Sequence, residues 1–595
     1  MKMKNKIIIL AALFGMLLGT SSCEDMLNSE SDRLIVNPSL SEKTDSMYYM
    51  LGILKGVQQA IDQYVLVNEM RGDLTAVNKH TSVALRELAN FSISENTENK
   101  YDSAWVYYRI INNCNYFIAH RDTTLKTGSI NVALPEYAQA KAIRLWAYIQ
   151  LCKTYGKVPF VTEPIISISQ ANESREWKTL DQIRDLLAPD LAHYVDVRLP
   201  DYGNIDAGSS NQGVSKSVRS RRIMFPVALV LGDAYLETDQ YEQAAHYYFD
   251  YLKKNQRAAL GFGANFYNYP NQADIPNDFG YTFSFPWESI FTGAFSVTEN
   301  HTIVPMATNK LQGLTSELPA IFGFNYYSTS SLTNELYLRE RQVDASAPYL
   351  ALSDAQEYYY TPQTAQVDTV VSSVKLGDMR RYAGMTRVTF TNDTTLSIVN
   401  KYNQANVNIY RDGKIYLRLA ECLNRMNYPD AAFMILKDGI SKENVQDQKY
   451  LDEATVTMLT TTIPFLATDN SAYFDSSTGI HVRGCGPKVA GPYSAYTFNN
   501  VVGTKLAEMQ DKYGYQPTGT KNDTIVAVED LLCDEYALET AFEGYRFSDL
   551  TRIAQHRNNG FPGANFGSQW LAKKLAFKNP QKDLTDPQNW YLPFK

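Results

Sequence analysis

The sequence predicts an all-α protein, in which helix-pair repeats form a scaffold that carries a large loop-rich region. Three observations support this class: helical periodicity over residues 45–257, a repeat spacing that occurs twice, and a long stretch that mixes aromatic residues with Asn, Asp, Gly and Pro. The chain has 595 residues, of which 44% are hydrophobic and 20% charged, so it can bury a sizeable core. A disordered chain would contain fewer aromatic residues and carry more net charge.

Residues 1–22 are predicted to form an export signal. Three lysines precede an apolar run over residues 7–18, and small residues then lead to Cys23. The run is too short to cross a bilayer, which requires about 20 residues. Cys23 stands where a bacterial lipoprotein signal places its lipid-bearing cysteine, so we expect a lipid on Cys23 and a polar tether over residues 23–44. Cleavage near Ser22 without lipidation is the alternative.

The N-terminal helical part is expected to span residues 45–257. Ala142, Leu145, Ile149 and Cys152 recur at the spacing of one helix face. Gly156 follows this face closely and is expected to end the helix. Farther along the chain, composition predicts a loop-rich aromatic region over 258–400, a helical repeat over 401–445, a loop-rich insertion over 446–520, and a C-terminal helical part with a tail over 521–595.

A spacing typical of tetratricopeptide repeats occurs twice within these helical parts. The two copies are Leu231-Gly232-x2-Tyr235 followed by Ala244-x3-Tyr248, and Leu419-Ala420-x2-Leu423 followed by Ala432-x3-Leu436. The small residues let two antiparallel helices approach, and the large residues fill the space between them. Such units bury their faces by stacking, so we expect poorer copies around 134–156 and 526–556.

Charge and motif content argue against several classes of function. Lys and Arg number 56 against 64 Asp and Glu, whereas nucleic-acid binders are basic, so we expect no nucleic-acid partner. The sequence has no GxSxG, HExxH or GxxxxGK[ST] motif, and its Cys and His residues show no metal-ligand spacing. We therefore predict no catalytic residues, no metal site and no cofactor. A glycoside hydrolase, which needs only two suitably separated carboxylates, is a less favoured alternative.

Aromatic residues are concentrated in the loop-rich region. Residues 258–309 contain no Lys or Arg, and 262–295 contain eleven aromatic residues. Sugars stack their apolar faces on aromatic rings and bind amides and carboxylates through their hydroxyls, so this composition favours a neutral polar ligand. The alternating residues from Tyr281 to Trp287 indicate a strand packed in the core instead. The predicted ligand-binding residues are Tyr267, Asn268, Tyr269, Asn271, Tyr326 and Tyr327.

Several segments together resemble the SusD/RagB family of outer-membrane nutrient-binding lipoproteins. The most specific is Glu543-Gly544-x-Arg546-Phe547-x-Asp549-Leu550-x-Arg552, which is similar to the family's E-G-x-R-W/F-x-D-L-x-R. The others are Arg71-Gly72-Asp73, Tyr155-Gly156-x-Val158-Pro159, Gly377-Asp378-x-Arg380, Arg411 with Tyr416-Leu417-Arg418-Leu419-Ala420-Glu421, and Asn589-Trp590-Tyr591-Leu592-Pro593. The sequence departs from the family at Cys422, which replaces the second alanine of A-E-A, and at the closing Leu-Pro-Phe-Lys.

The resemblance implies a tetratricopeptide-like all-α fold and a function without catalysis. The protein would be anchored in the outer membrane by its lipid, face outward, capture oligosaccharides or polysaccharides, and deliver them to a SusC-type TonB-dependent transporter. A peptide receptor of the same family is the main alternative, and a scaffold that binds only protein is another. The family's ligand sites lie in variable loops, so no binding residue is carried over from the motifs.

The motif residues are expected to stabilise the scaffold. Glu543, Arg546, Asp549 and Arg552 are three positions apart, so we expect them to form a charged ladder along one side of a helix. Arg411 and Glu421 are expected to hold helix ends.

Overall fold

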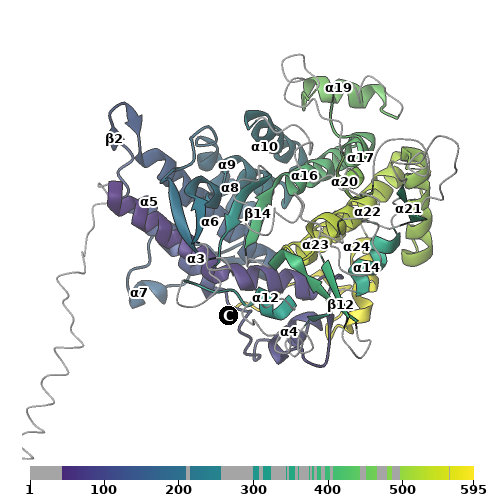
Figure 1. The fold of residues 1–595 in the computed structure, drawn as a ribbon, viewed down its shortest axis with the longest axis horizontal. Helices are drawn as coiled ribbons and strands as arrows, with labels where there is room; N and C mark the ends of the chain where they lie inside the picture. The colour runs from purple at the N-terminus through teal and green to yellow at the C-terminus, as the bar shows by residue number, and fades with distance from the viewer. Residues whose placement is uncertain are drawn as a thin grey trace, which may run out of the picture.

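The computed structural model describes residues 43–209, 215–255, 299–306, 313–322, 343–344, 347–355, 359–360, 374–375, 378, 380, 385–389, 395–402, 406–441, 450–465, 479–485, 496–561 and 563–595. Helices dominate these residues, which confirms the predicted all-α class (Figure 1). Of the helices in these ranges, none is both long and apolar enough to cross a membrane. Cys23 and nearly all of the predicted tether lie outside the described residues.

The N-terminal helices pack around the long helix α3 (Lys43–Arg71), which runs along the molecule in Figure 1. It packs against α5 (Trp105–His120) and α6 (Ala133–Tyr155), which also lie against each other. As predicted, α6 ends at Tyr155, and Gly156 follows with a φ of 77°, which glycine adopts without strain. The shorter helices of this part are α4 (Val83–Ala89), α7 (Ile168–Ala171) and α8 (Leu180–Ala192).

Both predicted repeats form helix pairs. The first pair is α9 (Val227–Leu236) with α10 (Tyr241–Lys254), and the second is α16 (Asp412–Arg425) with α17 (Pro429–Lys437). A Cβ on Gly232 would lie only 2.6 Å from a ring carbon of Tyr248, so the small residue does permit the close approach that the large one fills. The poorer copy expected around 526–556 coincides with the pair α22 (Lys521–Thr540) and α23 (Arg546–Gly560), whereas residues 134–156 form the single helix α6, which pairs with α5 before it. The pairs stack, because α10 packs on α16 and α16 packs on α22.

The strands in the described residues form two-stranded antiparallel ladders. The pairs are β1 (Ala76–Val77) with β9 (Val343–Asp344), β2 (Lys126–Thr127) with β3 (Ile130–Asn131), β4 (Val158–Pro159) with β5 (Trp177–Lys178), β6 (Asn204–Ser209) with β7 (Ser215–Arg219), β8 (Asn300–Val304) with β14 (Val407–Arg411), β10 (Tyr359–Tyr360) with β11 (Val374–Lys375), and β12 (Met385–Thr389) with β13 (Thr395–Val399). Every residue of β8 and β14 is buried, so this ladder belongs to the core rather than to the surface.

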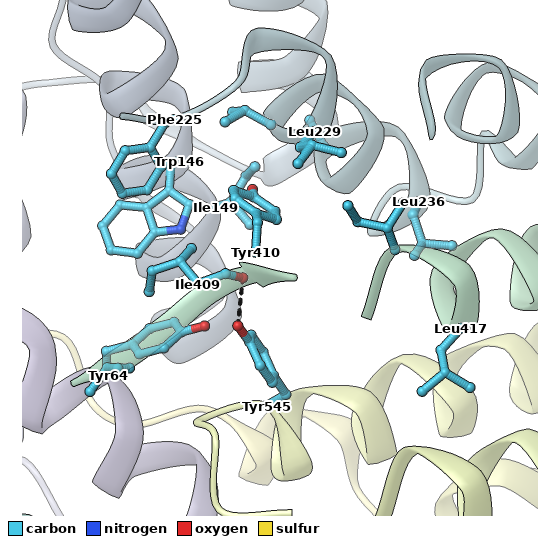
Figure 2. Close-up of a cluster of buried hydrophobic side chains, with 14 of the residues drawn as sticks. Tyr64, Trp146, Ile149, Phe225, Leu229, Leu236, Ile409, Tyr410, Leu417 and Tyr545 are labelled. Atoms are coloured by element: carbon cyan, nitrogen blue, oxygen red, sulfur yellow. Dashed lines mark hydrogen bonds between the residues drawn. The ribbon is translucent and has the colours of Figure 1, made fainter. Parts of the chain in front are cut away.

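Aromatic side chains from distant segments meet around β14 (Figure 2). The Trp146 ring of α6 lies 5.1 Å from the Phe225 ring, measured between centroids. The Tyr545 hydroxyl donates a hydrogen bond to the Ile409 carbonyl of β14 at 2.6 Å, and the Tyr64 ring of α3 meets the Tyr545 ring edge-on. Buried tyrosines need such a partner for their hydroxyl. This cluster therefore joins the N-terminal helices to the C-terminal part of the chain.

The stretch 446–520, predicted to be a loop-rich insertion, contains three helices among its described residues. They are α19 (Glu453–Thr461), α20 (Ile480–Cys485) and α21 (Phe498–Tyr513). The last begins where the Thr497 hydroxyl accepts a hydrogen bond from the Asn500 amide and ends at Gly514, whose φ is 75°. It packs against α22 and α24 (Phe566–Leu575).

Among its described residues, region 258–400 contributes the helices α12 (Leu318–Phe322) and α14 (Ala347–Ala355).

Candidate functional site

The predicted ligand-binding residues lie outside the residues that the structure describes. They are Tyr267, Asn268, Tyr269, Asn271, Tyr326 and Tyr327. The described elements on either side of their segments are α10 and β8 for the first four, and α12 and β9 for the tyrosine pair. These flanking elements define the framework from which the loop-rich segments start and to which they return.

Helix α12 is attached to α3 through a group of polar contacts. Asp62 of α3 accepts hydrogen bonds from the Ser316 hydroxyl at 2.5 Å and from the Glu317 amide at 2.7 Å. Burial raises the pKa of Asp62. The Glu317 carboxylate contacts the Lys100 ammonium at 2.7 Å and accepts a hydrogen bond from the Tyr101 hydroxyl at 2.5 Å. The segment that carries Tyr326 and Tyr327 therefore starts from a fixed position beside α3.

Strand β8 is held equally firmly at the other end of the aromatic segment. One ring nitrogen of His301, Nε2, lies 2.5 Å from the Asp412 carboxylate, and the other, Nδ1, lies 2.8 Å from the Tyr251 hydroxyl. The Thr302 hydroxyl donates to the Met224 carbonyl at 2.6 Å. Residues 256–298 thus leave from α10 and return to a strand that is itself bonded to α10 and α16.

The residues of the resemblance motifs bind one another in the interior. Arg411 donates to Glu543 at 2.9 Å and to Glu539 at 2.7 Å, and it also contacts Glu299 at 3.0 Å. Burial raises the pKa of Glu543, but the positive charges of Arg411 and Lys401 outweigh burial and leave that pKa below its ordinary value. Arg411 also donates to the Glu539 carbonyl at 2.6 Å, near the end of α22, which confirms its predicted role at a helix end.

The predicted charged ladder is only partly correct. Asp549 and Arg552 do bond along α23, at 2.8 Å. Arg546, however, pairs with Asp73 after α3, and Glu543 lies in the turn before α23 begins and pairs with Arg411. Because Glu543 lies before the helix and Arg546 binds Asp73 rather than its neighbours along α23, the four residues do not form a single row.

Glu421 was expected to hold a helix end, but it lies inside α16 and binds side chains of α16, α22 and α23 instead. Its carboxylate accepts hydrogen bonds from Arg552 at 2.8 Å and from Tyr536 at 2.7 Å, and it contacts Arg425 at 2.8 Å. Burial raises the pKa of Glu421, but the arginines outweigh burial and hold that pKa far below its ordinary value. Because these carboxylates and guanidinium groups bind one another in the interior, the motif residues form framework rather than a ligand site.

A cavity of about 1170 Å³ lies between α14, α21 and α22. Three of its lining carboxylates, from Glu508, Asp530 and Asp534, are close enough together to hold a metal ion. Lys505 already lies among them: its ammonium bonds to Asp534 and is 3.0 Å from Glu508. Burial lowers the pKa of Lys505, but these carboxylates outweigh burial and raise it well above its ordinary value. The lysine ammonium thus supplies the positive charge at this cluster.

A second cavity, of about 970 Å³, lies where the C-terminal tail crosses the end of α6. We call it the tail cleft. Its lining residues are Ser94, Glu95, Cys152, Lys153, Tyr155, Gly156, Lys157, Trp177, Thr179, Leu180, Asp181, Glu237, Thr238, Asp239, Thr551, Arg552, Gln555, Lys582, Gln588, Trp590, Tyr591, Leu592, Pro593 and Phe594. None of its side chains is among the predicted ligand-binding residues, because they come from segments that are far apart in the chain and meet only in the fold.

No protein-family model and no curated protein sequence matches this chain. Solved structures match it over most of its length. A SusD superfamily protein from Bacteroides thetaiotaomicron VPI-5482 is 13% identical, with a TM-score of 0.51, and the match covers 90% of this chain and 94% of that one. B. fragilis NanU is 14% identical, with a TM-score of 0.52 and coverage of 91% and 93%. A SusD superfamily protein from Bacteroides vulgatus ATCC 8482 is 12% identical, with a TM-score of 0.50 and coverage of 92% and 98%. At this identity, the likeness establishes a shared fold.

Proposed function

We propose that this chain, which has the fold of the SusD superfamily proteins, is a nutrient-binding lipoprotein of the bacterial outer membrane. In this proposal it captures oligosaccharides or polysaccharides outside the cell and delivers them to a SusC-type TonB-dependent transporter, without catalysing a reaction. The observation that carries the proposal is the shared fold over about nine-tenths of the chain. The motif segments support it, since their charged residues form the interior framework of that same fold.

The loop-rich region is the proposed place of ligand capture. Its aromatic residues and its lack of cations over 258–309 suit a neutral polar ligand better than a peptide, whose carboxyl terminus needs a positive partner. The contacts of α12 and β8 support this assignment, because they fix the points where the loop-rich segments leave the scaffold. A peptide receptor with the same fold is the second candidate, and the binding experiment below distinguishes the two.

We expect the double change Tyr267→Ala/Tyr269→Ala to weaken glycan binding about tenfold or more, because each ring supplies a stacking surface for a sugar. Isothermal titration against malto-, laminari-, xylo- and manno-oligosaccharides measures the effect, with the melting temperature as a check on folding. If wild type and variant bind the glycan equally well, the binding site is not at Tyr267 and Tyr269, and Tyr326 and Tyr327 become the next candidates. If the wild type binds peptides but no glycan, the ligand class is wrong and the peptide receptor replaces it.

We expect Cys23→Ala to release the protein from the outer-membrane fraction when it is produced without a transporter, because the acyl chains on this cysteine would be its anchor. Fractionation followed by immunoblotting measures the distribution. Ser22→Ala is the matched control: it keeps a small residue before the cysteine and should leave the protein in the membrane. A wild type that is soluble from the outset would instead support cleavage near Ser22 without lipidation.

A further inference from the structure

Aromatic rings form part of the wall of the tail cleft. Trp177 of β5 keeps 50% of its surface exposed. The Phe594 ring of the tail packs against the Trp177 ring at 4.9 Å between centroids, with the ring planes at 70°. Tyr591 lies over Gly156, where an added Cβ would sit 3.4 Å from its ring. The tail therefore holds the indole of Trp177 in place beside an open cavity.

A nearly buried carboxylate, that of Glu237, lines the tail cleft. The Glu237 side chain is only 7% exposed, and its Oε1 atom contacts Arg552 at 3.0 Å, Arg418 at 3.1 Å and Lys153 at 3.3 Å. Burial raises the pKa of Glu237, but these cations outweigh burial and bring it to about 2. Oε2 accepts no hydrogen bond from any residue that the structure describes. Glu237 thus lines the cleft with an ionised oxygen that is free to accept.

The charges around the tail cleft balance one another. Four cationic side chains and four carboxylates line it, namely Lys153, Lys157, Arg552, Lys582, Glu95, Asp181, Glu237 and Asp239. An anion would meet the carboxylates and a cation would meet the lysines, so neither is favoured. A neutral molecule with many hydroxyl groups can use both, since each hydroxyl donates and accepts.

A single short segment joins the tail cleft to the polar contacts that attach α12 to α3. Ser94 and Glu95 line the cleft, and a few residues later Lys100 and Tyr101 bind Glu317 beside α12. The last residue of the chain, Lys595, contacts Asp102 of this segment at 3.4 Å. The cleft therefore borders the framework from which the loop-rich region starts.

We propose that the tail cleft is a second saccharide-binding site, which takes one to a few sugar units of a neutral glycan. Trp177 provides the stacking surface, and Glu237 Oε2 with the Lys153 ammonium binds hydroxyls. Its volume of about 970 Å³ suits a ligand of this size. This inference rests on the proposed function, because the same glycan would bind both the loop-rich region and the cleft.

The test compares two exposed tryptophans by isothermal titration with the malto-, laminari-, xylo- and manno-oligosaccharides named above. The wild type should bind the short forms of its preferred glycan at two sites per chain. Trp177→Ala should remove one site, whereas Trp105→Ala, which changes a 61% exposed tryptophan outside the cleft, should leave both. Affinity for the long polysaccharide should fall about tenfold in Trp177→Ala and stay unchanged in Trp105→Ala. Tyr267→Ala/Tyr269→Ala should keep the cleft site.

A second readout does not depend on a stable alanine variant. In the NMR spectrum of the wild type, the indole N–H resonance of Trp177 should shift when the glycan is added, and that of Trp105 should not. The Trp177 resonance is assigned from its absence in Trp177→Phe. If Trp177→Ala still binds glycan at two sites, or if the Trp177 signal does not shift while glycan is bound, the tail cleft is not a saccharide-binding site. Either result leaves the proposed function intact. A wild type that binds none of the glycans would overturn both.

Discussion

Replacing Arg411 by alanine is expected to lower the free energy of unfolding by about 3–5 kcal/mol, because it takes one positive partner from two buried carboxylates and leaves them with only Arg380 and Lys401. Glu539 loses a hydrogen bond of 2.7 Å and Glu543 loses two, of 2.8 and 2.9 Å, and both side chains are almost completely buried. The Glu539 carbonyl also loses its donor. Urea denaturation followed by circular dichroism measures the change.

Arg219→Ala is the matched control for Arg411→Ala. Arg219 also pairs with a carboxylate, Asp201 at 2.9 Å, but its side chain is 60% exposed. An exposed pair of this kind contributes about 0–1 kcal/mol, so the control should unfold at nearly the wild-type urea concentration. Equal, small effects of the two changes would mean that the carboxylates around Arg411 are hydrated rather than buried.

The pH dependence of the Arg411→Ala effect gives an independent check. The folded-state pKa of Glu543 lies below its unfolded value, so its pairing stabilises the protein above the ordinary carboxyl pKa, and this stabilisation is lost as the pH falls through the folded value. The stability difference between wild type and Arg411→Ala should therefore shrink as the solution is acidified.

Local patterns were sufficient to predict much of the scaffold. The helix that carries Leu145 and Ile149 ends next to Gly156, because glycine alone relieves the strain of a positive φ there. Gly232 and Tyr248 meet as their repeat spacing predicted, because this contact depends only on helix geometry and side-chain size. Such features are decided by residues close together in the chain.

Features that depend on distant segments could not be predicted in this way. Arg411 and Glu543 are 132 positions apart, so no local spacing indicates that they pair. Helix α21 was missed because, among its residues, only Met509 is fully buried, which leaves a weak apolar stripe. Trp177 lies in a strand of two residues, and its role depends on a tail that arrives from the other end of the sequence.

Gly567→Ala is expected to destabilise the protein by about 3 kcal/mol or more, because overpacking costs about 1–3 kcal/mol even where side chains can move, and here the obstacle is backbone. Gly567 lies in the first turn of α24, where this helix crosses α23. An added Cβ would overlap the carbonyl oxygen of Ala554 in α23. Moving that oxygen away would shift the whole of α23, whose Arg552 and Arg546 belong to the buried framework.

Gly503→Ala tests the same chemical change in a helix with room for it. Gly503 is exposed within α21, and an added Cβ would meet nothing within 4 Å. Alanine favours a helix over glycine by about 0.8–1 kcal/mol, so this variant should be slightly more stable than wild type. Thermal and urea unfolding of both variants should therefore show opposite signs. A Gly567→Ala protein as stable as the wild type would show that α23 and α24 lie farther apart than the structure places them.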